Sequence, residues 1–144
     1  MSNTKAMPQL LRMFCQGGMV APPILALLLV VPLMEWTVNG KQVSYSELWS
    51  SGAGLTMLVF MLLGAAGAWG LAARASWARW AWVATPITPI LVAAVHPKTW
   101  FTQEVTADSS VWLGAVATSA IIYACLFLVS SVKNYAVNSA ATDA

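Results

Sequence analysis

The chain has 144 residues, of which 59% are hydrophobic and only 8% charged, and its formal net charge is +2. A soluble domain carries about 25% charged residues, so this chain has too few charges to cover a water-facing surface. Its scattered basic residues form no stripe that would follow a nucleic-acid backbone. Its two cysteines, Cys15 and Cys125, form no C-x-x-C pair. The composition therefore indicates a membrane protein and does not support nucleic-acid binding, a disulfide or a zinc site.

Four long stretches of the sequence contain no Asp, Glu, Lys or Arg. They hold 22, 26, 18 and 24 residues, and about 20 helical residues cross the hydrocarbon core of a bilayer. Only helices and closed barrels can cross lipid, and the stretches lack the strict alternation of barrel strands. The sequence therefore predicts one all-α membrane domain. It is a bundle of four transmembrane helices at about 19–34, 51–73, 77–95 and 110–132.

Residues 7–18 precede the first predicted span and have an apolar helical face. Pro8 suits a first helical turn and Gly17-Gly18 suit a helix end. Two interpretations stay open: a short helix on the cytoplasmic membrane surface, or an extension of the first span. The apolar face consists of Met7, Leu10, Leu11 and Phe14.

The basic residues predict the orientation of the bundle. With the N-terminus inside, five of them flank the inner ends of the helices and two flank the outer ends, as the positive-inside rule favours. Both termini are then cytoplasmic in a multi-pass protein of the cell inner (plasma) membrane, and residues 135–144 form a flexible tail. The inner residues are Lys5, Arg12, Arg74, Arg79 and Lys133, and the outer ones are Lys41 and Lys98.

The two halves of the chain resemble each other. Residues 23–25 and 89–91 both read Pro-Ile-Leu, and pairs of tryptophans at 36/49 and 100/112 bound the two predicted outer loops. This similarity is typical of two parallel helical-hairpin repeats. Proline and tryptophan also favour helix ends in membranes, so a chance match is the alternative. Most of the eight tryptophans fall near helix ends, which is typical of an interfacial aromatic belt.

The segment Thr85-Pro86-Ile87-Thr88-Pro89 is unusual for a membrane helix. Pro86 and Pro89 each lack an N–H and so predict a kink in the third span. Unwound backbone of this kind marks binding sites in transporters, whereas Thr85 and Thr88 can also bond to the freed backbone of a plain structural kink. The segment is therefore predicted to be a kink, with a ligand site as the alternative.

Two of the predicted helices carry small residues four positions apart, which let helices approach closely. Packing within one chain is the first interpretation, and assembly with another membrane protein or with a second copy is the alternative. The residues of these faces are Gly64, Ala68, Gly70, Gly114 and Thr118.

The chemistry of the chain is otherwise sparse. No ionisable residue lies in the middle of a predicted span, although such residues mark proton relays and ion pathways. No nucleophile–base pair, metal-ligand cluster or cofactor motif is visible, so we predict no enzyme activity, metal or cofactor. The leading hypothesis is a non-catalytic interaction protein, either an accessory or assembly subunit of a membrane complex or an immunity-type binder. The alternative is a small transporter or channel subunit that lacks a buried coupling residue.

Overall fold

The computed structural model describes residues 8–32, 35–38, 40–130 and 132, and Met7 and the predicted tail at 135–144 lie outside this part. Helices account for most of it. In chain order the elements are α1 (Gln9–Val30), β1 (Trp36–Val38), β2 (Lys41–Val43), α2 (Tyr45–Ser50), α3 (Ala53–Ala72), α4 (Ala78–Ala84), α5 (Thr88–Val95), α6 (Trp100–Ala107), α7 (Ser109–Tyr123) and the π-helical turn η1 (Ala124–Leu128).

Three helices are long and apolar enough to cross a membrane. They cover Leu11–Val30 of α1, all of α3, and Ser109–Leu128 of α7 with η1. The pair α4 and α5 is apolar enough as well, but a break between the two helices bends it by 60°. A fourth span therefore exists only if α4 and α5 cross together.

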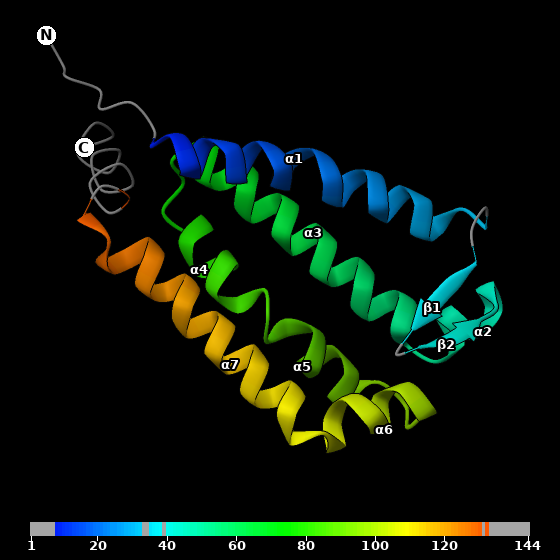
Figure 1. Ribbon diagram of the computed structural model, residues 1–144. Helices are drawn as coiled ribbons and strands as arrows, with labels where there is room; N and C mark the ends of the chain where they lie inside the picture. Colours follow the sequence, from blue (N-terminus) through cyan, green and yellow to red (C-terminus); the bar gives the residue numbers. More distant parts are fainter. Residues whose placement is uncertain (1–7, 33–34, 39, 131, 133–144) are drawn as a thin grey trace, which may run out of the picture.

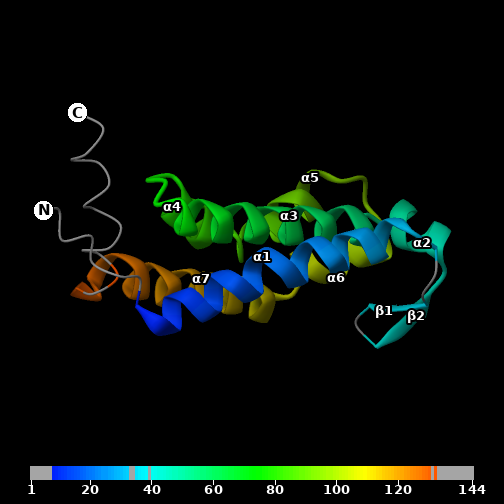
Figure 2. The ribbon, with the colours of Figure 1, turned by 90° about the horizontal axis from the view of Figure 1, so that it is seen from above.

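The long helices lie roughly alongside one another (Figure 1). α3 packs between α1 on one side and α4 and α5 on the other, and α7 packs against α4. Seen from above, α1 and α7 lie on one side of the molecule, and α3 and α4 lie behind them (Figure 2). We call the end formed by β1, β2, α2 and α6 the hairpin end. The opposite end, where α1 begins, α3 turns into α4 and η1 finishes, is the terminal end.

The start of α1 bears on the two interpretations of residues 7–18. α1 runs without a break from Gln9 to Val30, which favours an extension of the first predicted span over a separate surface helix. Gly17 and Gly18 lie inside the helix. A methyl group on Gly18 would lie only 2.8 Å from the Cβ of Ala68 in α3. α1 packs closely against α3 at Gly18. This packing stabilises α1 at the position where the glycine pair alone predicts that the helix ends.

The chain is mostly helical, as predicted, and the hairpin end adds one short β-hairpin that the sequence analysis did not predict. β1 and β2 pair antiparallel, with Trp36 opposite Val43 and Val38 opposite Lys41. Gly40 has φ +77°, which glycine adopts without strain. The dipeptide Asn-Gly between two short β-prone segments is a strong hairpin signal, and this signal identifies the hairpin where apolar periodicity does not.

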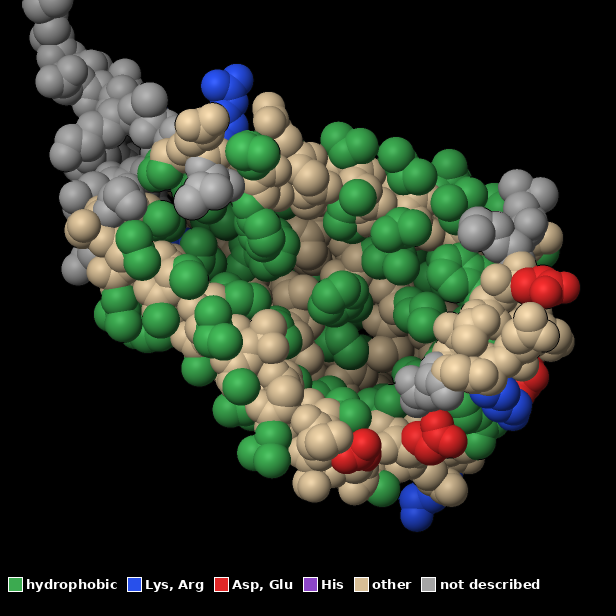
Figure 3. Space-filling view, viewed as in Figure 1, with side chains coloured by type: hydrophobic (Ala, Val, Ile, Leu, Met, Phe, Trp, Pro, Cys, Tyr) green, Lys and Arg blue, Asp and Glu red, His purple; other side chains and the backbone are tan. Residues whose placement is uncertain are grey.

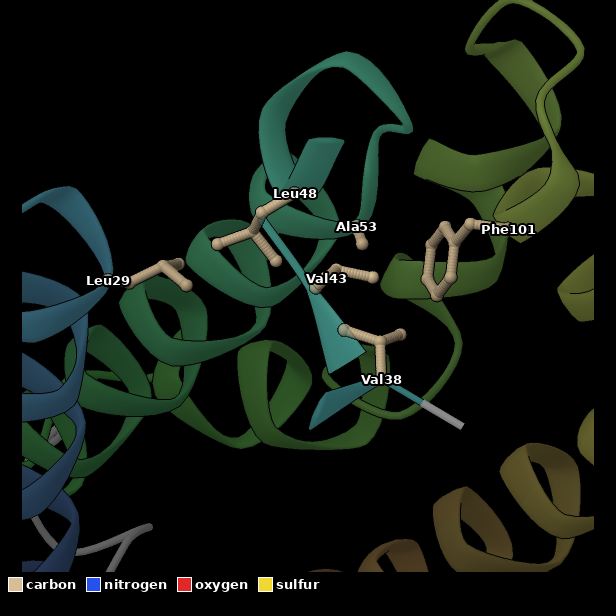
Figure 4. Packing of buried hydrophobic residues seen from close by; sticks show 6 residues of the cluster. All are labelled: Leu29, Val38, Val43, Leu48, Ala53 and Phe101. Atoms are coloured by element: carbon tan, nitrogen blue, oxygen red, sulfur yellow. The ribbon is translucent and has the colours of Figure 1, made fainter. Parts of the chain in front are cut away.

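Two separate hydrophobic clusters lie at the two ends of the molecule. The cluster at the hairpin end draws one buried residue from each of α1, β1, β2, α2, α3 and α6, and these side chains converge in Figure 4. Its members are Leu29, Val38, Val43, Leu48, Ala53 and Phe101. The cluster at the terminal end joins α1, α3, α4 and η1 through Leu11, Cys15, Leu71, Ala78 and Leu126. The hairpin end is therefore a packed lobe rather than a set of loose loops.

The predicted repeat stays a prediction. The first pair of long helices is joined by a β-hairpin and α2, whereas α5 and α7 are joined by α6 alone. The two connections thus differ in secondary structure although both begin and end near tryptophans.

Candidate functional site

The break between α4 and α5 lies at the proline segment, where a kink was expected. The hydroxyl of Thr85 donates to the carbonyl of Ala81 at 2.8 Å, and the hydroxyl of Thr88 donates to the carbonyl of Ala84 at 2.8 Å. Thr85 is buried, and Pro89 sits in the first turn of α5. Both hydroxyls therefore bond to the backbone one turn earlier, which is the arrangement of a structural kink.

The small residues of α3 pack inside the chain. A methyl group on Gly70 would lie 2.7 Å from the Cβ of Ala78 and 2.9 Å from the ring of Trp77. Ala68 is fully buried and faces Gly18 of α1. Gly64 is buried too, but a methyl group there would have no neighbour within 4 Å. Ala68 and Gly70 thus serve the contacts of α3 with α1 and α4.

Trp82 occupies a slot that the sequence pattern did not reveal. Its ring lies against Gly67 of α3, where a methyl group would approach to 2.9 Å, and against Gly18 of α1. The ring of Phe14 covers it, with centroids 4.7 Å apart. Trp82 is therefore a packing residue that joins α1, α3 and α4. Sequence spacing cannot predict it, because the slot is formed by glycines from two other helices.

The small residues of α7 have a different environment. Gly114 and Thr118 are both exposed, and nothing lies within 4 Å of a methyl group placed on Gly114. The hydroxyl of Thr118 donates to the carbonyl of Gly114 at 2.8 Å. Across α7 and η1 only Ser119 and Leu126 are buried. The Gly114–Thr118 face of α7 thus has no partner within the described part of the chain.

A hollow lies between α1 and α7 near the terminal end, and we call it the α1–α7 groove. Figure 3 shows hydrophobic side chains over the helices that flank it. It encloses a cavity of about 420 Å³ whose lining is almost entirely apolar. The lining residues are Leu11, Phe14, Trp82, Ile121, Ile122, Cys125, Leu126 and Val132.

Arg79 lies at the terminal end, where α4 meets η1. Its guanidinium carbon is 4.7 Å from the ring centre of Phe127 in η1, and neither residue lines the groove. Its Nε is buried and has no hydrogen-bond partner in the described residues, and neither has the hydroxyl of Ser119, which is 5% exposed. A buried donor without an acceptor is costly. The indole Nε1 of Trp82, which lines the groove, is likewise buried without a hydrogen-bond partner in the described residues.

The polar side chains of the hairpin end are used in local contacts. The hydroxyl of Thr99 donates to the carbonyl of Ser51 at 2.6 Å and also caps α6. Lys41 forms an ion pair with Glu47 at 3.1 Å and lies 4.5 Å from the ring centre of Trp100. These contacts tie the hairpin and α6 to the rest of the lobe.

Asp108 caps the N-terminus of α7 by accepting from the backbone N–H of Ser110 at 2.8 Å. Hydrogen bonds from Ser110 lower the pKa of the Asp108 carboxyl. A lowered pKa means that the cap is in place above the unfolded-state pKa and is lost as the pH falls through the folded-state value. Asp108 and Glu104 border an open cavity of about 660 Å³, but no group of three His, Cys, Asp or Glu residues among the described positions could hold a metal ion.

Comparison with known proteins identified no relative: no family model, no curated protein and no solved structure matches this chain.

Proposed function

We propose that the protein is a four-span protein of the cell inner (plasma) membrane, with both termini in the cytoplasm. The three uninterrupted apolar helices support this proposal, and α4 with α5 supplies the fourth span as one broken crossing. In this orientation the terminal end, with Arg12, Arg74 and Arg79, faces the cytoplasm, in line with the positive-inside rule.

Within the membrane, we propose a non-catalytic interaction role, as an accessory or assembly subunit of a membrane complex or as an immunity-type binder. The Gly114–Thr118 face of α7 carries this proposal. Faces of small residues let helices approach closely. The corresponding face of α3 is filled from within the chain at Ala68 and Gly70, whereas the face of α7 is empty.

A Gly114→Leu variant tests this role. The leucine side chain is expected to stay in the lipid-facing space around α7, so the chain should fold normally but lose at least 80% of the partner protein that co-purifies in mild detergent. Ala120→Leu is the matched control, since Ala120 is also exposed on α7 but lies on another face of the helix. Equal recovery of the partner with both variants, or purification of the native chain as a lone monomer, would contradict the role.

A small transporter or channel subunit is the second candidate, and the 60° break between α4 and α5 is the observation that favours it. The hydroxyls of Thr85 and Thr88 bond to their own helix, so the break offers a solute few free polar groups. The interaction role therefore has the stronger support.

A further inference from the structure

We propose that the partner of α7 is a single transmembrane helix with an apolar middle and with one Lys or Arg at the end that lies beside the hairpin end of this chain. The inference rests on the proposed interaction role and adds the chemistry of the partner. One continuous surface carries it. This surface joins an acidic cavity at the hairpin end, the Gly114–Thr118 face, and the α1–α7 groove at the terminal end.

The three parts of this surface lie along one side of α7 and η1. Val111 borders the cavity, and Ile121 and Cys125 line the groove. With Gly114 and Thr118 between them, these residues follow one another at steps of three, four, three and four positions, and this spacing places side chains on one helix face. All five residues are exposed. A second helix that packs on α7 therefore meets the cavity, the small residues and the groove together.

The length and shape of the surface fit a helix. From Val111 to Cys125 it extends for about 21 Å at 1.5 Å per residue, within a segment that can itself cross a membrane. A protein chain at this depth must bond its own backbone groups, so it is helical. At Gly114 nothing lies within 4 Å of a missing methyl group, so a partner backbone can approach closely. The groove, with its apolar volume of about 420 Å³, has room for larger side chains of the same helix.

The cavity at the hairpin end determines the charge of the partner. Its volume is about 660 Å³, and Glu104 of α6 and Asp108, the cap of α7, border it together with Val111. Hydrogen bonds from Ser110 lower the pKa of the Asp108 carboxyl, so this group is charged at neutral pH. No described cation forms an ion pair with Asp108. A Lys or Arg of the partner would complement these acids. The surface from Val111 to Cys125 has no charged residue, so the partner is apolar there.

The same acids disfavour a symmetric pair of α7 helices from two copies of this chain. Two copies inserted in the same orientation would bring Glu104 and Asp108 of both to the same end of the contact. Like charges placed together at an interface are unfavourable. A different membrane protein with a basic residue at this end meets no such repulsion.

Native mass spectrometry of the full chain in mild detergent, with equal amounts of two synthetic peptides, tests the proposal. Both peptides have a leucine core of about 20 residues with alanine at every fourth position. One carries lysine at one end and glutamine at the other, and the second carries glutamine at both ends. The native chain is expected to bind one peptide and to prefer the lysine peptide about fivefold, the upper end for an exposed ion pair.

A matched pair of variants tests the charge. Asp108→Asn should remove most of the preference, because asparagine removes the charge but keeps the helix cap. Glu35→Gln removes an exposed acid of the hairpin end that does not border the cavity, so it should leave the preference unchanged. Equal binding of the two peptides by the native chain, or equal effects of the two variants, would overturn the proposal. Binding of neither peptide would overturn it too, because lipid would then cover the surface.

A second set of variants tests the place of binding. Ile121→Trp should fill the groove and reduce both peptide adducts about tenfold, whereas Leu113→Trp, at a position that is 70% exposed and outside the groove, should leave them unchanged. Gly114→Leu should block both peptides. If the native chain binds both peptides equally and Gly114→Leu still blocks them, the charge of the partner is wrong and the interaction role stands. Peptides that bind the Gly114→Leu variant as well as the native chain would contradict both.

Discussion

Replacing Gly70 by Ala is expected to lower the free energy of unfolding by about 1–3 kcal/mol, the usual cost of overpacking. The new methyl group would lie 2.7 Å from the Cβ of Ala78. Because that atom is attached directly to the backbone of α4, the clash cannot be relieved by a rotation of a side chain. α3 and α4 must move apart, and Trp77 must leave its place against Gly70. The loss is measured as a lower unfolding midpoint of the purified protein in detergent.

Gly64→Ala is the matched control on the same helix. Its methyl group meets nothing within 4 Å, and alanine favours helix over glycine by up to about 1 kcal/mol. The unfolding midpoint should therefore stay the same or rise. If the two variants changed the midpoint equally, the close contact between α3 and α4 would be wrong.

Replacing Gly52 by Ala is expected to have the largest single effect at the hairpin end, about 2–4 kcal/mol. Gly52 has φ +84°, and a side chain in this left-handed conformation costs about 1–2 kcal/mol. In addition, a methyl group would lie 2.8 Å from Nδ1 and 2.9 Å from Cγ of His96. Backbone strain and the steric clash therefore add, and both act where α2 turns into α3.

The two contributions can be separated with variants that the chain itself offers. Gly40 has φ +77° but nothing within 4 Å of its missing methyl group, so Gly40→Ala should show the strain alone. In the His96→Ala background, Gly52→Ala should lose its steric part and become as mild as Gly40→Ala. Strictly additive effects of Gly52→Ala and His96→Ala in a double-mutant cycle would show that the two residues do not touch.

The long apolar helices were the most predictable part of the fold. α3 covers Ala53–Ala72, close to the predicted 51–73, and α7 with η1 covers most of the predicted 110–132. Their length and lack of charge are properties of single segments, which composition reports directly. The bend between α4 and α5 was also expected, because Pro86 and Pro89 remove backbone donors wherever they lie in a helix.

Features that depend on contacts between segments could not be predicted in the same way. Gly17-Gly18 predict a helix end as long as α1 is considered alone, and only the approach of Ala68 explains why the helix continues. No sequence pattern singled out Trp82, which fills a slot made by glycines of two other helices. Apolar periodicity does not predict the hairpin, because each of its strands has only three residues, and the Asn-Gly dipeptide is its signal in the sequence.

The candidate sites also depend on contacts between segments, which the sequence alone does not give. The sequence identified Gly64, Ala68, Gly70, Gly114 and Thr118 as equivalent small-residue positions. The structure separates them, because Ala68 and Gly70 are packed from within the chain and Gly114 and Thr118 are exposed. The sequence analysis used Arg79 only as one of the basic residues that predict the orientation of the bundle. The position of Arg79 over Phe127 depends on how α4 meets η1.

The proposal that α4 and α5 cross the membrane as one broken span is tested most directly by labelling single cysteines from one side of sealed inner-membrane vesicles. In a background with Cys15 and Cys125 replaced by serine, Ser76→Cys precedes α4 and Lys98→Cys follows α5, and both positions are exposed. A maleimide that cannot cross the membrane should label Ser76→Cys only from the cytoplasmic face and Lys98→Cys only from the opposite face. Labelling of both from the same face would make α4 and α5 a re-entrant loop, leave three spans, and place the two termini on opposite sides.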